Sequence, residues 1–290
     1  MPYDPAVAGS AQQAERTEQL AELAELAERR HRDPAAARDR ARVLAERATD
    51  PVVAARAAWV VGLADHELGA AAEAVASYQR AIDRCLAHRA DDDDGRAERS
   101  TARPTRRSGA QRAGSGDDPV RAETLALAHS SLAISCLSVG DTDRAQREMA
   151  AARDLSPAST RGQVEMLHGL LRQRTGHLKE AQATLRRALR LLEQVDDQPS
   201  IARLRLNRGA LRAYQGDLAG ALDDLAACEQ IAQAHDLPVL VAMAAHNTGF
   251  TEGRRGNLPE ALAAFDRAEA AYARLENPAR LTAVLLADRC

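Results

Sequence analysis

The chain has 290 residues, of which 45% are hydrophobic and 28% charged, and its formal net charge is −3. This is enough apolar material to bury a core in one or two domains, and a charge near zero argues against an affinity for nucleic acid or lipid over the whole surface. Aromatic residues make up only 2% whereas alanine is abundant, which favours packed helices over β-sandwiches and barrels. No apolar run reaches membrane-span length and no signal peptide is evident, so we expect a cytoplasmic protein.

Residues 1–50 are predicted to form a degenerate N-terminal helix pair. Apolar residues recur at helical spacing through residues 20–50, and Asp33-Pro34 divides this stretch into two amphipathic halves. No glycine stands inside either half, in contrast to the repeats that follow. A terminal repeat of this kind is often atypical because one of its faces meets water.

From residue 51 a single pattern recurs. A glycine is followed five residues later by alanine, nine later by a large apolar residue and twelve later by a small one, as in Gly69, Ala74, Tyr78 and Ala81. The glycines are Gly69, Gly140, Gly176, Gly216 and Gly256, and seven residues before them stand Gly62, Ala133, Gly169, Gly209 and Gly249. Glycine inside a helix costs about 1 kcal/mol. We therefore predict that a second helix crosses there too closely for a side chain to fit.

The pattern predicts five helix–turn–helix repeats, at residues 51–90, 119–156, 157–197, 198–236 and 237–277. The turn glycine is expected in the left-handed conformation, with Asp141, Asp217 and Asn257 capping the second helices. Prolines such as Pro51 and Pro119, several of them after Asp or Asn, mark the first turn of the first helices. Residues 278–290 begin a further helix that is either a cap or the start of another repeat.

An insertion at residues 91–118 separates the first two repeats. It is rich in Gly, Ser, Arg and Asp and nearly devoid of large apolar residues, so we predict a disordered segment. Its arginines suggest nucleic-acid binding as an alternative. Flanking aspartates oppose that alternative, and no aromatic residue is interleaved for base stacking.

The chain resembles the tetratricopeptide repeat family over residues 50–290, with Val60–Ala81 and Asn247–Ala268 as its best copies. The resemblance implies an all-α solenoid of stacked antiparallel helix pairs. Trp59 lies one place off the family's Trp position, and Arg172, Arg212 and Glu252 occupy its Tyr position.

None of the common catalytic or metal-binding motifs occurs in the sequence, so we predict a protein that is not an enzyme and that takes no cofactor or metal. The four cysteines form no CxxC pair, and Cys136 and Cys228 are expected to be buried hydrophobes. Asp223 and Asp224 are adjacent on a helix and are interpreted as solvated charges.

The family resemblance places a ligand-binding groove on the first helices. Carrying its positions over gives, repeat by repeat, Trp59, Leu63 and His66; Ser130, Ser131 and Ile134; Met166, Leu170 and Arg174; Arg203, Asn207 and Tyr214; and His246, Asn247, Phe250 and Arg254. Asn207 and Asn247 share one register, where an amide can hold a peptide backbone by donor and acceptor together. The groove arginines suggest an acidic or C-terminal peptide, with ordinary solubilising charge as the alternative.

Three functions remain open at this point. The first is a protein-interaction scaffold that binds a protein or peptide partner. The second is the N-terminal regulatory region of a larger actinobacterial CHAT-domain, caspase-like peptidase, which the segment Leu206–Gly209 and the 40-residue periods resemble. The third is the repeat region of a bacterial transcriptional regulator. A homodimer through Leu281, Val284 and Leu285 is also predicted.

Overall fold

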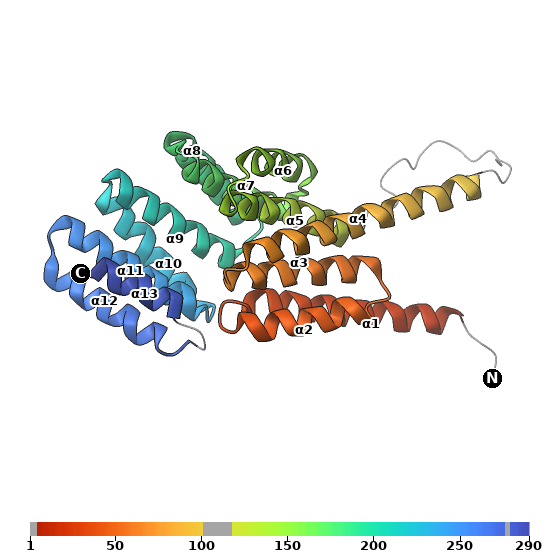
Figure 1. The fold of residues 1–290 in the computed structure, drawn as a ribbon, viewed down its shortest axis with the longest axis horizontal. Coiled ribbons are helices and arrows are strands. Elements are labelled where there is room, and N and C mark those ends of the chain that lie inside the picture. Colours follow the sequence, from red (N-terminus) through yellow and green to blue (C-terminus); the bar gives the residue numbers. More distant parts are fainter. Residues whose placement is uncertain (1–4, 101–117, 276–278, 290) are drawn as a thin grey trace. The chain divides into compact units, whose positions relative to one another are not determined.

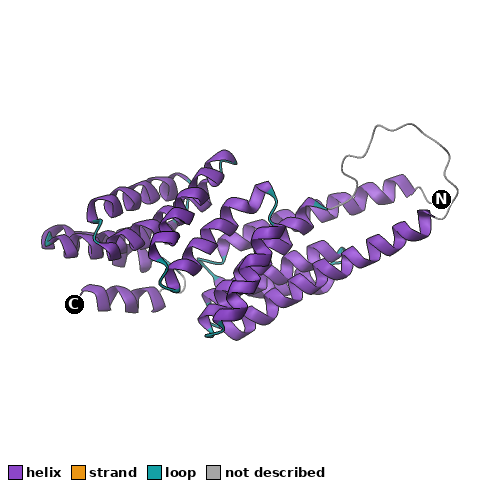
Figure 2. Ribbon diagram, turned by 90° about the horizontal axis from the view of Figure 1, so that it is seen from above, coloured by secondary structure: helices purple, strands orange, loops and turns teal. Residues whose placement is uncertain are grey.

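The computed structural model describes residues 5–100, 118–275 and 279–289, and within these ranges every regular element is an α-helix (Figure 2). The predicted all-α class is therefore confirmed. The helices, labelled as in Figure 1, are α1 (Pro5–Arg29), α2 (Pro34–Arg47), α3 (Pro51–Glu67), α4 (Ala71–Ser100), α5 (Pro119–Ser138), α6 (Thr142–Leu155), α7 (Ala158–Arg174), α8 (Leu178–Gln194), α9 (Gln198–Gln215), α10 (Leu218–Ala234), α11 (Pro238–Arg255), α12 (Leu258–Tyr272) and α13 (Ala279–Arg289).

The helices form two compact units, one of Met1–Arg30 with Pro34–Pro157 and one of His31–Asp33 with Ala158–Cys290. We call them unit 1 and unit 2. In unit 1, α2 to α6 pack one on the next, and α1 lies against α2 and α3. In unit 2, α7 to α13 pack successively, and the first helix α9 also contacts the first helices α7 and α11.

The turns within the repeats are made as predicted. All five turn glycines have φ between +77° and +88°, a conformation that L side chains rarely adopt. Asp141 and Asp217 cap α6 and α10, because their carboxylates accept the backbone N–H of Arg144 at 3.0 Å and of Gly220 at 3.1 Å. The capping prediction is wrong for Asn257, whose amide instead donates to Glu252 at 2.7 Å.

The starts of α3 and α5 combine an aspartate cap with a first-turn proline. Asp50 accepts the backbone N–H of Val52 at 2.7 Å, and Asp118 accepts that of Val120 at 2.9 Å. Arg16 of α1 forms ion pairs with both aspartates. One guanidinium thus ties together the beginnings of two stacked first helices.

The small residues inside the first helices mark close helix crossings, as predicted. A Cβ added at these glycines would lie 2.5 Å from Tyr78 at Gly62, 2.6 Å from Leu185 at Gly169, 3.0 Å from Leu225 at Gly209 and 2.7 Å from Phe265 at Gly249. Each partner is the large apolar residue of the same repeat. The cost of a helical glycine is therefore offset by a buried side chain that fills the space above it.

The core runs between the first and second helices of each repeat. Tyr78, Leu132 and Met149 are fully buried in unit 1, and Leu185 and Leu225 occupy the corresponding place in unit 2. Within the described residues, no helix combines the length and hydropathy of a membrane-spanning segment.

The predicted insertion differs from the structure at its start. α4 continues to Ser100, so residues 91–100 are helical and not disordered. Extending an existing helix adds one hydrogen bond for each residue fixed, and no proline interrupts the sequence from Ala71 until Pro104. Residues 101–117 lie outside the described part of the chain.

The C-terminal helix α13 corrects one residue of the dimer prediction, which otherwise stays untested. Leu285 is fully buried in its own chain, in a cluster with Phe265 and Tyr272, so it is not available to a second copy. Val284 is exposed, and the side chain of Leu281 lies outside the described residues.

Candidate functional site

Five of the predicted groove residues are buried: Trp59, Ser130, Ser131, Met166 and His246 are each at most 8% exposed. Four of them stand ten residues before a turn glycine, a position that the structure directs into the helix packing. Their assignment to an open groove is therefore wrong.

Trp59 and Ser131 link neighbouring helices. The Trp59 indole N–H of α3 donates to Ser131 of α5 at 3.1 Å, and the Arg56 guanidinium lies 4.4 Å from the centroid of the Trp59 ring. Burial lowers the pKa of Arg56. His66 and Ser135 make a second contact between the same helices, with His66 Nδ1 at 3.2 Å from the hydroxyl oxygen.

His246 connects three helices of unit 2. Its Nε2 lies 3.0 Å from an Asp288 carboxylate oxygen of α13, and its Nδ1 lies 3.4 Å from the Tyr272 hydroxyl of α12. The imidazole also packs edge-on against Phe265. His246 thus holds α13 against the last repeat and does not face a ligand.

The open part of the first helices in unit 2 follows a different register. Its residues stand 13, 9, 6 and 2 positions before Gly176, Gly216 and Gly256, and all are half-buried except the last position, which is exposed. We call this set the first-helix face; it consists of Gln163, Leu167, Leu170 and Arg174 on α7, Arg203, Asn207, Ala210 and Tyr214 on α9, and Met243, Asn247, Phe250 and Arg254 on α11. Gln163, Leu167, Ala210 and Met243 were missed, although the same spacing would have found them.

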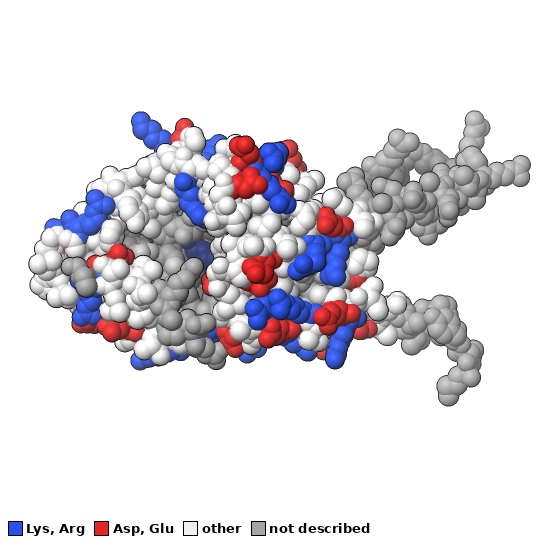
Figure 3. Space-filling view, in the orientation of Figure 1, with Lys and Arg blue, Asp and Glu red and all other residues white. Residues whose placement is uncertain are grey.

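The first-helix face has a distinct chemistry. None of its twelve residues is acidic and three are arginines, whereas the whole chain carries a net charge of −3. Figure 3 shows one side of the molecule, where basic and acidic side chains both occur. The side-chain amides of Asn207 and Asn247 are half-buried and have no hydrogen-bond partner among the described residues. The face therefore offers unpaired amides in a cationic setting.

Three predicted residues come together at one end of this face. The rings of Tyr214 and Phe250 lie 5.7 Å apart between centroids, at an interplanar angle of 44°. The Arg254 guanidinium lies 6.0 Å from the Phe250 centroid and donates to the backbone oxygen of Ala213 at 2.7 Å. Tyr214 is 68% exposed. We call these three residues the aromatic step.

In the first, third and fourth repeats, the residue at the family's Tyr position pairs with the second helix of its own repeat. Asp65 accepts a hydrogen bond from Ser77 at 3.2 Å, and Arg172 donates to Thr184 at 2.9 Å. In the fourth repeat the partner is Asp224, which is buried and bound by Arg205, Arg208 and Arg212. The interpretation of Asp224 as a solvated charge is therefore wrong, while Asp223 is exposed.

Two carboxyl groups in unit 1 have pKa values that are shifted in opposite directions. Burial raises the pKa of Asp65, against the opposing effects of Ser77, Arg42 and Arg38. The hydrogen bond from His129, whose Nδ1 lies 2.7 Å from the carboxylate, lowers the pKa of Glu148.

The cysteines behave as buried hydrophobes. Cys136 and Cys228 are at most 1% exposed, as predicted, and Cys85 is equally buried. Burial raises the pKa of Cys85 to about 11 and that of Cys228 to about 12. Among the described residues, no group of three His, Cys, Asp or Glu side chains is placed to hold a metal ion.

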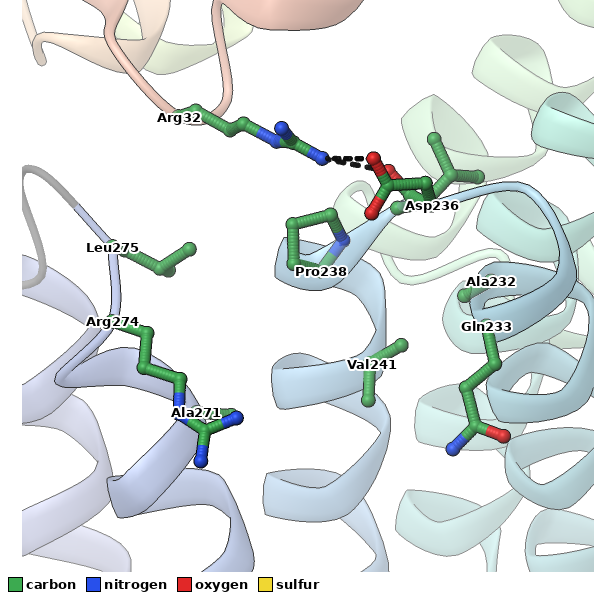
Figure 4. A pocket seen from close by; sticks show the side chains of 10 residues that line it. Arg32, Ala232, Gln233, Asp236, Pro238, Val241, Ala271, Arg274 and Leu275 are labelled. Carbon is green, nitrogen blue, oxygen red and sulfur yellow. Dashed lines mark hydrogen bonds and ion pairs between the residues drawn. The ribbon is translucent and has the colours of Figure 1, made fainter.

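A cavity of about 560 Å³ lies in unit 2 at the end of α11 opposite the aromatic step (Figure 4). Leu237, Pro238 and Val241 form one wall, and Ala271 and Leu275 belong to another. Arg32 reaches its rim and pairs with Asp236 at 2.9 Å, while Arg274 stands on the α12 side. The cavity is separate from the predicted site residues.

No protein-family model and no curated protein matches the sequence. Among solved structures, BtubC from P. vanneervenii matches 85% of this chain and 91% of its own, with 18% identity and a TM-score of 0.53. NprR in complex with its cognate peptide NprX matches the whole of this chain and 74% of its own, with 14% identity and a TM-score of 0.55. A Rap protein complexed with competence and sporulation factor matches 86% and 72%, with 12% identity and a TM-score of 0.51.

At these identities the likeness concerns the fold. Successive antiparallel helix pairs, left-handed turn glycines and small residues at the crossings together define an all-α, tetratricopeptide-like solenoid.

Proposed function

We propose that this protein is a non-catalytic binding module that holds an extended peptide segment of a partner on the first-helix face of unit 2. The observation that carries the proposal is the pair Asn207 and Asn247, which stand 40 residues apart at one register without side-chain partners. An amide offers a donor and an acceptor at once, the same combination that a peptide backbone presents. Two such amides on contacting helices can fix two points of one extended strand.

The structural neighbours support a peptide as the ligand. NprR was solved with its cognate peptide, and the Rap protein was solved with competence and sporulation factor. The charge of the face adds a preference, since Arg174, Arg203 and Arg254 favour an acidic segment or a terminal carboxylate.

Binding of fluorescein-labelled hexapeptide pools, acidic or neutral in composition, tests the proposal by fluorescence anisotropy on the full chain. We expect the acidic pool to bind more tightly, and Asn207→Ala/Asn247→Ala to weaken both pools about tenfold or more, because each lost hydrogen bond contributes about 1 kcal/mol. Gln194→Ala/Gln230→Ala, which removes two exposed amides from second helices, is the matched control. Equal binding by wild type and the Asn207/Asn247 variant would overturn the proposal.

The alternative of a regulatory region joined to a CHAT-type peptidase stays a prediction. Reading the natural coding sequence beyond the codon for Cys290 tests it, because a peptidase domain must then follow in frame.

A further inference from the structure

The aromatic residues of this chain are distributed unevenly between core and surface. Of the six that the structure describes, four are core residues at most 8% exposed: Trp59, Tyr78, Phe265 and Tyr272. The other two, Tyr214 and Phe250, are both on the first-helix face and contact each other. The exposed aromatic surface of the described residues is therefore concentrated at the aromatic step.

The arginine of the aromatic step is held in place without a counter-ion. Arg254 donates to the backbone oxygen of Ala213, the residue before Tyr214, and so links the ends of α9 and α11. No carboxylate of the described residues forms an ion pair with Arg254, and nearby Glu252 pairs with Arg255 and Asn257. A guanidinium compensated only by a neutral carbonyl retains the capacity to bind a carboxylate.

We propose that the aromatic step selects the peptide: Tyr214 and Phe250 bind an aromatic side chain of the ligand, and Arg254 binds a carboxylate on the neighbouring residue. This inference rests on the proposed function and names the class of its ligand. The tilted pair exposes ring surface against which an aromatic ring of the ligand can pack. Tyr and Arg are also among the residue types that contribute most of the binding energy at interfaces. Phe250 follows Asn247 by three residues, about 4.5 Å along the helix axis, which is between the lengths of one and two extended peptide residues.

Four labelled hexapeptide pools test this selectivity by anisotropy on the full chain. Each pool has one fixed adjacent pair, present in both orders, with the other positions randomised: Phe with Asp, Phe with Asn, Ala with Asp, or Ala with Asn. We expect the Phe and Asp pool to bind at least about tenfold more tightly than the Ala and Asn pool. Tighter binding of the Ala pools than of the Phe pools would overturn the proposal.

Variants separate the two contributions. Tyr214→Ala should abolish the preference for Phe over Ala and keep that for Asp over Asn; Arg254→Gln should do the reverse, and Tyr214→Phe should keep both. Tyr214 is mostly exposed, so its replacement leaves the core intact. Leu258→Ala and Arg267→Gln, which alter exposed residues of α12, are controls expected to change neither preference.

The outcomes distinguish this inference from the function on which it rests. If Asn207→Ala/Asn247→Ala weakens all four pools while Tyr214→Ala leaves the Phe preference unchanged, the face binds peptides and the aromatic step does not select them. If the Asn207/Asn247 variant binds every pool as wild type does, the proposed function itself is wrong.

Discussion

Replacing two glycines of one helix can change stability in opposite directions, depending on which atoms a new Cβ would meet. In α11, a Cβ at Gly249 would lie 2.7 Å from the Phe265 ring, whereas one at Gly253 would meet nothing closer than 3.9 Å. We expect Gly249→Ala to lower the free energy of unfolding by about 1–2 kcal/mol, because overpacking outweighs the gain in helix propensity. Gly253→Ala, the control, should raise it by up to about 1 kcal/mol. Urea denaturation measures both, and equal effects would contradict the proposed close crossing.

Adjacent aspartates of α10 provide a second comparison of this kind. Asp224 is buried against Arg205, Arg208 and Arg212, while Asp223 is exposed. Removing one partner of a buried ionic cluster leaves uncompensated charge, so Asp224→Ala should lower the free energy of unfolding by about 3–5 kcal/mol. Asp223→Ala should change it by less than about 0.5 kcal/mol. Thermal unfolding followed by circular dichroism measures both changes. Equal, small changes in the two variants would contradict the buried role of Asp224.

Between the helices α5 and α6, Glu148 should make the stability of the pair depend on pH. The hydrogen bond from His129 holds the pKa of Glu148 below its ordinary value of 4.5. A lowered pKa in the folded state means that the stabilisation is present above pH 4.5 and is lost as the pH falls through the lowered value. The difference in unfolding free energy between wild type and Glu148→Gln should therefore shrink between pH 6 and pH 3. Gln146→Ala, exposed on the same helix, should show a pH-independent difference.

Some features of individual helices and turns could be predicted from the sequence pattern alone, and others could not. The turn glycines and the crossing residues Gly169 and Gly209 were identified from spacing alone, because a left-handed turn and a close crossing each demand a particular residue type at a fixed position. The missing side-chain cap at Asn257 and the end of α4 were not predicted, because an amide or a helix end has several local solutions of similar energy.

At the scale of the whole molecule, unit 2 should fold and bind by itself. Its core clusters and the whole first-helix face lie within residues 158–290. We expect this fragment to be helical, to unfold cooperatively, and to bind the acidic peptide pool within about threefold of the full chain. A fragment of residues 198–290 is the control. It lacks α7 and also α8, and Leu185 and Leu192 of α8 share a core cluster with residues of α9. Circular dichroism and anisotropy measure both; a disordered 158–290 fragment would contradict the division into units.

The all-α class, the repeat period, the turn glycines and the pairing of small with large residues, such as Gly249 with Phe265, could all be predicted from the amino-acid sequence. All of these depend on contacts within one repeat, which recur at fixed spacings and so leave a periodic pattern. The burial of Trp59, Met166 and His246, the three ion pairs of Asp224, the packing of Leu285 in its own chain and the contact of Tyr214 with Phe250 emerged only from the folded structure. These outcomes depend on which side of a helix its neighbours cover, and a shift of one residue turns a side chain by about 100° from an open face into the packing.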